Sequence, residues 1–295
     1  MRPRHFGAVM SAMVTPFDGQ GRLDLDAART VARWLVNHGN EGLVIGGTTG
    51  EATTLTDTEL CDLVAAVAEA VTVPVVAGTA SNDTAHSVAL TRRARGLGAA
   101  GVLAVGPYYS RPPQAGIEAH FRAIADATDL PVMLYDVPGR TGRRVAHDVL
   151  LRLFREVPNV LAFKDATGDP AAAAALVAEG GGHFDLYSGD DAMTLPLLAC
   201  GAVGVVGTTT HWTAPRFRRM LDAFHAGDHA AARAVHAELL PSIRFVNNDE
   251  SVYSMSVKVM LRTLGLPTGP CRLPLPPAPA GKEDEARAVW RALAR

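Results

Sequence analysis

The chain has few cysteines, no long apolar run and no large excess of positive or negative charge. Each of these features excludes a class of protein. Its 3 cysteines lie far apart in 295 residues, so they form neither a disulfide framework nor a paired-thiol metal site. Its 28 Lys and Arg residues nearly balance 30 Asp and Glu residues, without a basic block that would favour nucleic acid. No apolar run approaches the roughly 20 residues that span a bilayer, and residues 1–17 lack the apolar segment of a signal peptide. We therefore expect no nucleic-acid or membrane partner, and a cytoplasmic location.

Motifs for metal, nucleotide or serine chemistry are missing as well. No HExxH pair, histidine cluster or paired cysteine indicates a metal. No GxSxG turn indicates a serine nucleophile. The glycine-rich stretch at residues 46–51 lacks the GK[ST] ending of a phosphate-binding loop. These absences argue against a metalloenzyme and against a nucleotide-binding protein.

What the chain does contain is a regular alternation of short apolar runs and longer amphipathic stretches. Continuous apolar strands separated by helices indicate a parallel sheet that is covered on both faces. Eight such units within about 225 residues fit a (β/α)8 TIM barrel. A doubly wound sheet would usually show a GxGxxG turn after its first strand, and none is present there. The expected strands are Val9–Val14, Gly42–Ile45, Pro74–Ala77, Gly101–Val105, Pro131–Tyr135, Val160–Lys164, Phe184–Tyr187 and Gly204–Gly207.

The same alternation predicts the helices and the organisation of the chain. No linker divides the sequence, so we predict one domain, with a barrel over residues 1–225 and a C-terminal helical extension over residues 226–295. The helices expected in the barrel are Asp24–His38, Asp57–Val71 after the cap Thr56, Asp83–Leu97, Gln114–Ala127, Ala146–Glu156, Pro170–Glu179, Asp190–Cys200 and Ala214–His225. Those expected in the extension are Ala230–Phe245, Val252–Leu264 and Glu283–Ala294.

Lys164 closes the sixth apolar strand and is the most informative single residue. A lysine in that place either extends its ammonium to water or is held there for chemistry. The active site of a (β/α)8 barrel lies at the carboxyl ends of the strands, and Tyr135 ends the strand before that of Lys164. The two side chains could meet there, and a phenol beside an amine can exchange protons. Burial would lower the pKa of the lysine and leave free amine to attack a carbonyl group.

Other strand ends also carry polar residues, and each of these residues could have either a structural or a substrate-binding role. The loop with Thr48 and Thr49 is either a tight turn or, through its N–H groups and hydroxyls, a site for a small carboxylate. Tyr109 and its neighbour Tyr108 follow the fourth strand and could equally be ordinary interface aromatics. Arg140 is either a solvated loop charge or a bidentate clamp for a carboxylate. We expect these loops, together with that of residues 188–191, to converge on one mouth.

Six motifs, in order along the chain, resemble those of one known family. They are GTTGEATTL, PYYSRPPQAGIEAHF, LYDVPGRTG, AFKDATGD, YSGDD and RLPLPP, and the likeness runs from about Gly7 to Pro277. The chain resembles the dihydrodipicolinate synthases, also called 4-hydroxy-tetrahydrodipicolinate synthases. The resemblance implies a (β/α)8 lyase of the Schiff-base aldolase type that joins pyruvate to L-aspartate 4-semialdehyde in lysine and diaminopimelate biosynthesis. It also implies a homotetramer, built as a dimer of dimers, that needs no metal or organic cofactor.

The resemblance further implies a role for each residue at the mouth. Lys164 would form the Schiff base with the keto carbon of pyruvate, and Tyr135 would donate and accept protons beside it. Thr48 and Tyr109 would complete a proton relay, with Tyr109 reaching into the site of the neighbouring subunit. The substrate-binding residues would be Thr49 for the pyruvate carboxylate, Val206 through its backbone, Arg140 for the carboxylate of L-aspartate 4-semialdehyde, and Gly189.

Some positions depart from the commonest pattern of the family. Asp136 replaces a frequent asparagine, and by strand alternation its side chain should point away from Tyr135. Residues 253–258 stand where many members have Asn-Pro-x-Pro-Val-Lys. The two histidines and the glutamate that line the regulatory pocket of lysine-inhibited members are replaced here by Asp57, Leu60 and His86. We therefore expect weak or absent inhibition by L-lysine.

Two other functions stay open at this point. The chain could be another pyruvate-dependent Schiff-base aldolase that acts on a sugar acid or a specialised metabolite. Arg140 argues against it, since the similar N-acetylneuraminate lyases lack Arg-Thr-Gly at that place and usually carry Ser-Thr at the positions of Thr48 and Thr49. A ligand-binding barrel without catalysis is disfavoured by the intact set of Lys164, Tyr135, Thr48 and Tyr109.

Overall fold

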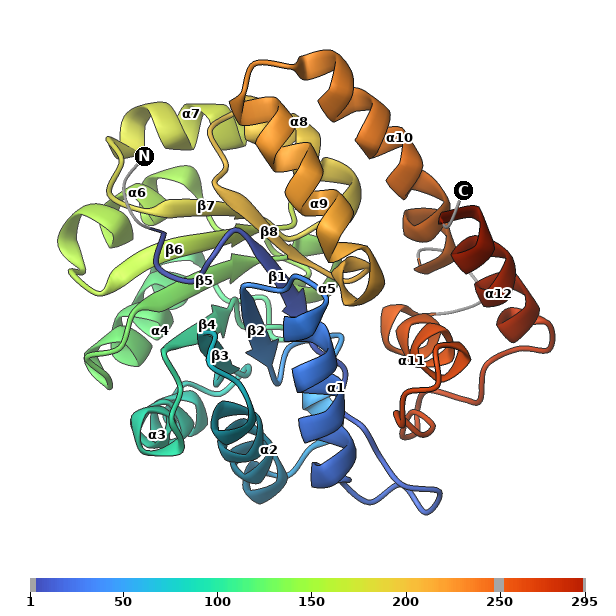
Figure 1. Cartoon of the computed structure of the whole chain (residues 1–295). Coiled ribbons are helices and arrows are strands. Elements are labelled where there is room, and N and C mark those ends of the chain that lie inside the picture. Colours follow the sequence, from blue (N-terminus) through green and yellow to red (C-terminus); the bar gives the residue numbers. More distant parts are fainter. Residues whose placement is uncertain (1–3, 247–251, 294–295) are drawn as a thin grey trace.

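Eight parallel strands close into a barrel in the computed structural model, which describes residues 4–246 and 252–293 (Figure 1). Each strand pairs with its neighbour in the sequence, and β1 also pairs with β8. The structure thus confirms the (β/α)8 barrel that the alternation of segments predicts. The strands are β1 (Val9–Ala12), β2 (Gly42–Ile45), β3 (Val75–Gly78), β4 (Gly101–Val105), β5 (Val132–Asp136), β6 (Val160–Asp165), β7 (Asp185–Ser188) and β8 (Gly204–Gly207).

Both faces of the barrel wall are buried, which explains why the strands are continuous apolar runs. In β5, Met133 and Tyr135 belong to the cluster inside the barrel, together with Val44 and Val206. Leu134, between them, belongs instead to the larger cluster formed with the surrounding helices. This alternation aims Tyr135 at the interior, at the carboxyl end of its strand.

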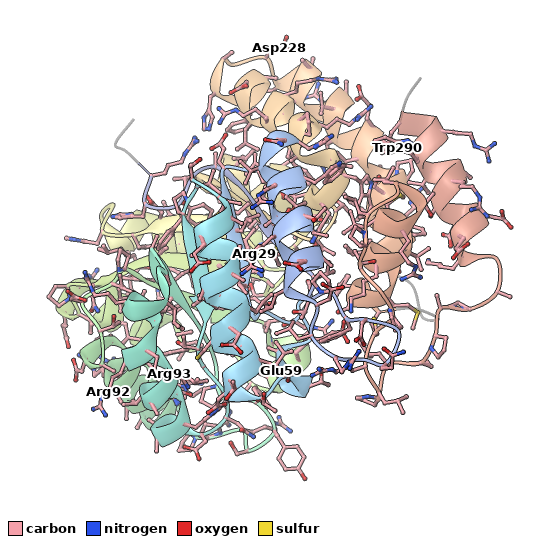
Figure 2. The ribbon with its side chains drawn as sticks, turned by 60° about the horizontal axis from the view of Figure 1, so that its bottom comes forward. Arg29, Glu59, Arg92, Arg93, Asp228 and Trp290 are labelled. Carbon is pink, nitrogen blue, oxygen red and sulfur yellow. The ribbon has the colours of Figure 1, made fainter. Side chains whose placement is uncertain are left out.

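The helices that connect the strands surround the barrel (Figure 1). Thr56 caps α2 as predicted: its hydroxyl accepts from the N–H of Glu59, whose carboxylate accepts from the N–H of Thr56. Charged side chains such as Arg92 and Arg93 of α3 lie on the exposed outer surface (Figure 2). These helices are α1 (Leu25–Asn37), α2 (Asp57–Ala70), α3 (Thr84–Ala94), α4 (Gln114–Asp126), α6 (His147–Glu156), α7 (Pro170–Gly180), α8 (Thr194–Ala199) and α9 (Thr210–His225).

Several local differences from the sequence-based expectation lie at the carboxyl end of the barrel. Strand β1 ends at Ala12 instead of Val14, and α8 begins at Thr194 instead of Asp190. A four-residue helix, α5 (Pro138–Thr141), follows β5 where only a loop was expected, and Gly142 ends it in a left-handed conformation. Helix α9 begins at Thr210, one turn earlier than the predicted start at Ala214. Its first turn is polar, which resembles a loop in sequence, but the hydroxyl of Thr210 is hydrogen-bonded to Ser11 of β1.

Three further helices pack along one side of the barrel (Figure 1): α10 (His229–Val246), α11 (Tyr253–Thr263) and α12 (Lys282–Leu293). Ala294, the expected last residue of the final helix, lies outside the described residues. Phe245 of α10 and Val257 of α11 share one apolar cluster with residues of the barrel strands and helices. Among the described residues, no helix combines the length and the apolar character needed to cross a membrane.

Candidate active site

Lys164 and Tyr135 meet at the carboxyl end of the barrel. They are paired in the register of β5 and β6, and the Nζ atom of Lys164 lies 4.2 Å from the centre of the Tyr135 ring. Only 5% of Lys164 and 6% of Tyr135 are exposed, so neither side chain extends to water. Of the two interpretations of Lys164, the structure therefore supports the one in which the side chain is held in place for chemistry, and not the one in which its ammonium is solvated.

Burial changes the acidity of both groups. It lowers the pKa of Lys164 to about 8, because a charged ammonium is poorly solvated there; the nearby Asp191 opposes this shift and Arg140 adds to it. Burial also raises the pKa of Tyr135 to about 12, while Arg140 and a hydrogen bond with Thr48 act in the opposite direction. At neutral pH the site therefore holds a protonated phenol beside an amine that is partly uncharged.

The loop after β2 is held in one conformation by contacts from both sides. The hydroxyl of Thr15 donates to the carbonyl of Gly50 over 2.5 Å, and the hydroxyl of Ser254 on α11 reaches the carbonyl of Thr48 over 3.5 Å. Glu51 takes a left-handed backbone conformation with φ of 55°, which is costly for a residue other than glycine. Its buried carboxylate forms an ion pair with Lys258 of α11, which fixes this strained turn.

A cavity of about 440 Å³ opens over Lys164 and brings together most of the residues that the sequence predicts. Its lining includes six of the eight candidates: Lys164, Tyr135, Thr48, Thr49, Arg140 and Gly189. Gly189 has a steric reason to be glycine, since a Cβ atom there would come within 2.9 Å of the Cγ atom of Lys164. The carboxyl ends of the strands thus converge on one mouth, where the active site of a (β/α)8 barrel lies.

The remaining two candidates do not line this cavity. Val206 is buried inside the barrel, in the same apolar cluster as Tyr135. Tyr109 is 91% exposed, has a left-handed φ of 69°, and lines a neighbouring cavity of about 510 Å³ together with Tyr108. Within one chain, Tyr109 therefore does not lie in the cavity over Lys164.

The cavity lining also includes Asp191, which lies in the loop of residues 188–191 expected at the mouth but was given no role of its own, and Tyr253, which sequence reasoning missed. Asp191 is buried and accepts hydrogen bonds from the backbone N–H groups of Thr208 and Thr209, so it connects the ends of β7 and β8. Its position directly after a strand is the reason why the loop of residues 188–191 was expected at the mouth. Tyr253 comes from the C-terminal extension, and nothing in the local sequence pattern indicates that it reaches the barrel mouth.

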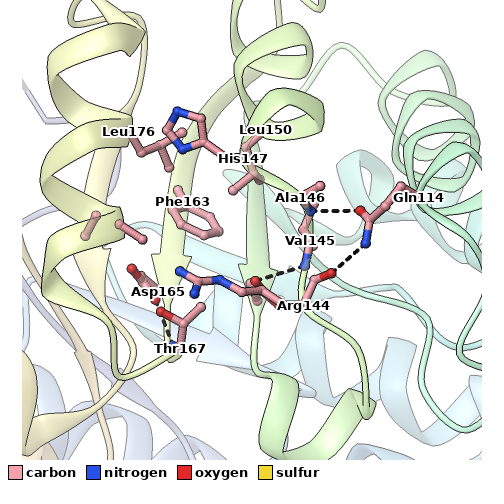
Figure 3. Close-up of a pocket in the computed structure, with 13 residues that line it drawn as sticks. Gln114, Arg144, Val145, Ala146, His147, Leu150, Phe163, Asp165, Thr167 and Leu176 are labelled. Carbon is pink, nitrogen blue, oxygen red and sulfur yellow. Dashed lines mark hydrogen bonds between the residues drawn. The ribbon is translucent and has the colours of Figure 1, made fainter.

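Asp136 points away from the active site, as strand alternation predicts. It lines another cavity, of about 400 Å³, on the outer side of β5 and β6 between α6 and α7, with Phe163, Asp165 and Arg144 (Figure 3). One Asp136 oxygen accepts from the N–H of Val145, and burial raises the pKa of this carboxyl group to about 7. The departure from asparagine therefore lies behind the strand, away from the face that carries Tyr135.

The cavity beside Tyr108 holds the positions at which the resemblance places the regulatory pocket of lysine-inhibited members. Asp57, Leu60 and His86 line it, and the ring of His86 lies 2.7 Å from the carboxylate of Asp57. A carboxylate that is already paired with a neighbouring side chain is less available to a ligand. This geometry adds a reason for the expectation of weak inhibition.

The chain is similar to known proteins over its whole length. A model of the Dihydrodipicolinate synthetase family matches residues 5–293. The chain is 50% identical to the 4-hydroxy-tetrahydrodipicolinate synthase of Acidothermus cellulolyticus, over 100% of this chain and 96% of that relative. It is 49% identical to the 4-hydroxy-tetrahydrodipicolinate synthase 2 of Streptomyces coelicolor, over 92% of this chain and 89% of the relative. The crystal structure of the DHDPS from Cyanidioschyzon merolae with lysine bound has a TM-score of 0.94 and 38% identity, with 99% of each chain covered.

Proposed function

Because the chain belongs to the dihydrodipicolinate synthetase family, we propose that it joins pyruvate to L-aspartate 4-semialdehyde, in lysine and diaminopimelate biosynthesis. It is an enzyme, a lyase on a (β/α)8 barrel. The observation that carries the proposal is the buried amine of Lys164 against the ring of Tyr135. An amine whose pKa lies near 8 is partly uncharged at neutral pH, as attack on a keto group requires.

The reaction begins when Nζ of Lys164 attacks the keto carbon of pyruvate. The keto oxygen takes up two protons and leaves as water, and a protonated imine remains on Lys164. The imine attracts electrons from the adjacent methyl group, so loss of a methyl proton gives an enamine. The enamine carbon attacks the aldehyde carbon, whose oxygen takes up a proton. Finally, the amino group of the second substrate adds to the imine carbon and displaces Lys164 as the ring closes.

Tyr135 supplies and removes the protons in these steps. Since its pKa lies near 12, its phenol is protonated at neutral pH and can donate to the oxygen that leaves as water. The side chain of Thr48, which lowers the pKa of Tyr135 and is exposed, offers the proton a path back toward solvent. The phenol therefore acts first as an acid and then, as phenolate, as a base toward the methyl group.

Two groups at the mouth bind the two carboxylates. Thr49 is buried in the cavity wall and receives the carboxylate of pyruvate. Val206 is buried in β8 inside the barrel, and the resemblance to the family assigns its backbone a contact with the same substrate. Arg140 is exposed at the rim, and its planar guanidinium suits the carboxylate of L-aspartate 4-semialdehyde. Gly189 leaves room for pyruvate next to Lys164.

Tyr109 completes the site of a neighbouring subunit in a homotetramer. A large aromatic side chain that is 91% exposed and held in a left-handed backbone conformation is typical of an interface residue. The relay then runs from Tyr135 through Thr48 to a partner's copy of Tyr109. A cytoplasmic location fits the three free cysteines, which a reducing compartment preserves.

The proposal is tested by measuring turnover with two sets of substrates. We expect the chain to consume pyruvate in the presence of L-aspartate 4-semialdehyde and to leave N-acetylneuraminate uncleaved. Cleavage of N-acetylneuraminate without reaction of the semialdehyde would instead assign the chain to the sugar-acid aldolases. The variant Arg140→Ala serves as a control, since it should raise KM for the semialdehyde and leave KM for pyruvate unchanged.

A further inference from the structure

Part of the wall of the active-site cavity comes from the C-terminal extension. Ile243 and Val246 of α10 and Tyr253, the first residue of α11, all line the cavity. Tyr253 lies beyond the last strand of the barrel in the sequence. The extension therefore contributes directly to the site and has more than a packing role.

Arg140 has few restraints of its own. It lies in the four-residue helix α5, and its side chain is exposed. Within the described parts of the chain, its guanidinium makes no ion pair or hydrogen bond to another side chain. An arginine side chain has many rotamers, so a guanidinium without restraints would be poorly placed to bind a carboxylate.

Tyr253 supplies a restraint at this point. The centre of the Arg140 guanidinium lies 5.3 Å from the centre of the Tyr253 ring, within the range of a cation–π interaction. Tyr253 is half-buried, and Ser254, the next residue in α11, contacts the carbonyl of Thr48. The ring is thus attached to a helix that is itself fixed against the active-site loop.

We propose that Tyr253 is a positioning residue, which holds the Arg140 guanidinium ready for the carboxylate of the second substrate. This inference rests on the proposed role of Arg140 as the carboxylate anchor. Because the proposed pyruvate site is formed by Lys164 and Thr49, whereas Tyr253 contacts Arg140, we expect Tyr253 to affect the second half of the reaction and to leave Schiff-base formation untouched. The aromatic ring carries this effect, and the phenolic hydroxyl is dispensable for it.

A double-mutant cycle on Tyr253 and Arg140 tests the proposal, with initial rates measured against both substrates. We expect Tyr253→Leu to raise KM for L-aspartate 4-semialdehyde about five- to tenfold, the range of a partly desolvated cation–π contact. KM for pyruvate should stay within twofold of the wild-type value, which also shows that the variant is folded. Tyr253→Phe, which keeps the ring, should behave like the wild type. In an Arg140→Ala background, Tyr253→Leu should have no additional effect.

Each other outcome overturns a defined part of the account. If Tyr253→Leu leaves KM for the semialdehyde unchanged, or raises KM for both substrates equally, Tyr253 does not position Arg140. If its effect persists in the Arg140→Ala background, it acts through another group, and the proposal is wrong. If Arg140→Ala alone leaves KM for the semialdehyde unchanged, the assignment of Arg140 as the anchor fails first, whatever the Tyr253 variants show.

Discussion

The chain contains only three lysines, and the structure buries all of them: Lys164 is 5% exposed, Lys258 1% and Lys282 4%. Each ammonium lies over an aromatic ring, at 4.2 Å from the ring centre for Lys164, 4.3 Å for Lys258 and 4.1 Å for Lys282. Burial and aromatic contact therefore do not distinguish the lysine of the candidate active site from the two in the extension.

The partners of the ammonium groups do distinguish them. Lys258 forms an ion pair with Glu51 at 2.5 Å and donates to the carbonyl of Pro270. Lys282 donates to the carbonyl of Phe245 and pairs with Glu285. Lys164 makes no ion pair or hydrogen bond within the described residues, and only the charge of Asp191 favours its protonated form. A buried lysine with partners is structural, whereas one without them has a free amine available for chemistry.

The largest effect is expected from Lys164→Met, because it removes the proposed nucleophile of the reaction. We expect kcat to fall by about a thousandfold or more, while the barrel remains folded. The rate is measured in a coupled assay with both substrates. The matched control is Lys258→Met, which should retain the ability to form the pyruvate imine. Equal losses of rate in the two variants would contradict the comparison.

The second effect concerns the stability of Lys258→Met. This substitution leaves the buried carboxylate of Glu51 without its partner, so we expect it to lower the free energy of unfolding by about 3–5 kcal/mol. Urea denaturation measures the loss. The double variant Lys258→Met with Glu51→Gln removes both charges and should recover much of it. If the single variant is as stable as the wild type, the ion pair does not hold the strained turn after β2.

The same substitution at Lys164 should have the opposite effect on stability. The pKa of Lys164 falls from its ordinary value of 10.5 to about 8 on folding, which corresponds to a cost of about 3 kcal/mol when the amine is charged. Between pH 8 and 10.5 the unfolded chain binds more protons than the folded chain, so this cost is released as the pH rises.

Lys164→Met should therefore be more stable than the wild type at pH 7, and the difference should shrink as the pH approaches 10. Denaturation of both proteins across this pH range gives the difference directly. The titration of Tyr135 is common to both proteins and largely cancels. A wild type that is more stable than Lys164→Met at pH 7 would mean that Lys164 has a stabilising partner.

The sequence alone predicts some of these contacts and misses others, depending on how far apart the two residues lie along the chain. The position of Lys164 beside Tyr135 follows from strand order and side-chain alternation, both of which are local patterns. The ion pair of Lys258 with Glu51 joins the last part of the chain to the loop after the second strand, and no local pattern indicates it. The contact of Tyr253 with Arg140 was missed for the same reason.

The smallest expected effect is the response to added L-lysine. The cavity beside Tyr108 offers Leu60 and a paired Asp57 and His86 in place of free groups for the ligand. We expect submillimolar L-lysine to leave the rate of the coupled assay essentially unchanged. Half-maximal inhibition in that concentration range would show that the remaining groups of the cavity suffice to bind lysine.

The most direct test of the central claim is to locate the pyruvate imine on the chain. The wild-type protein is incubated with pyruvate and borohydride, digested, and examined by mass spectrometry for the reduced adduct on each lysine. We predict the adduct on Lys164, with Lys258 and Lys282 unmodified, because only Lys164 has a free amine beside a cavity. An adduct on Lys258 or Lys282, or none on any lysine, would contradict the account.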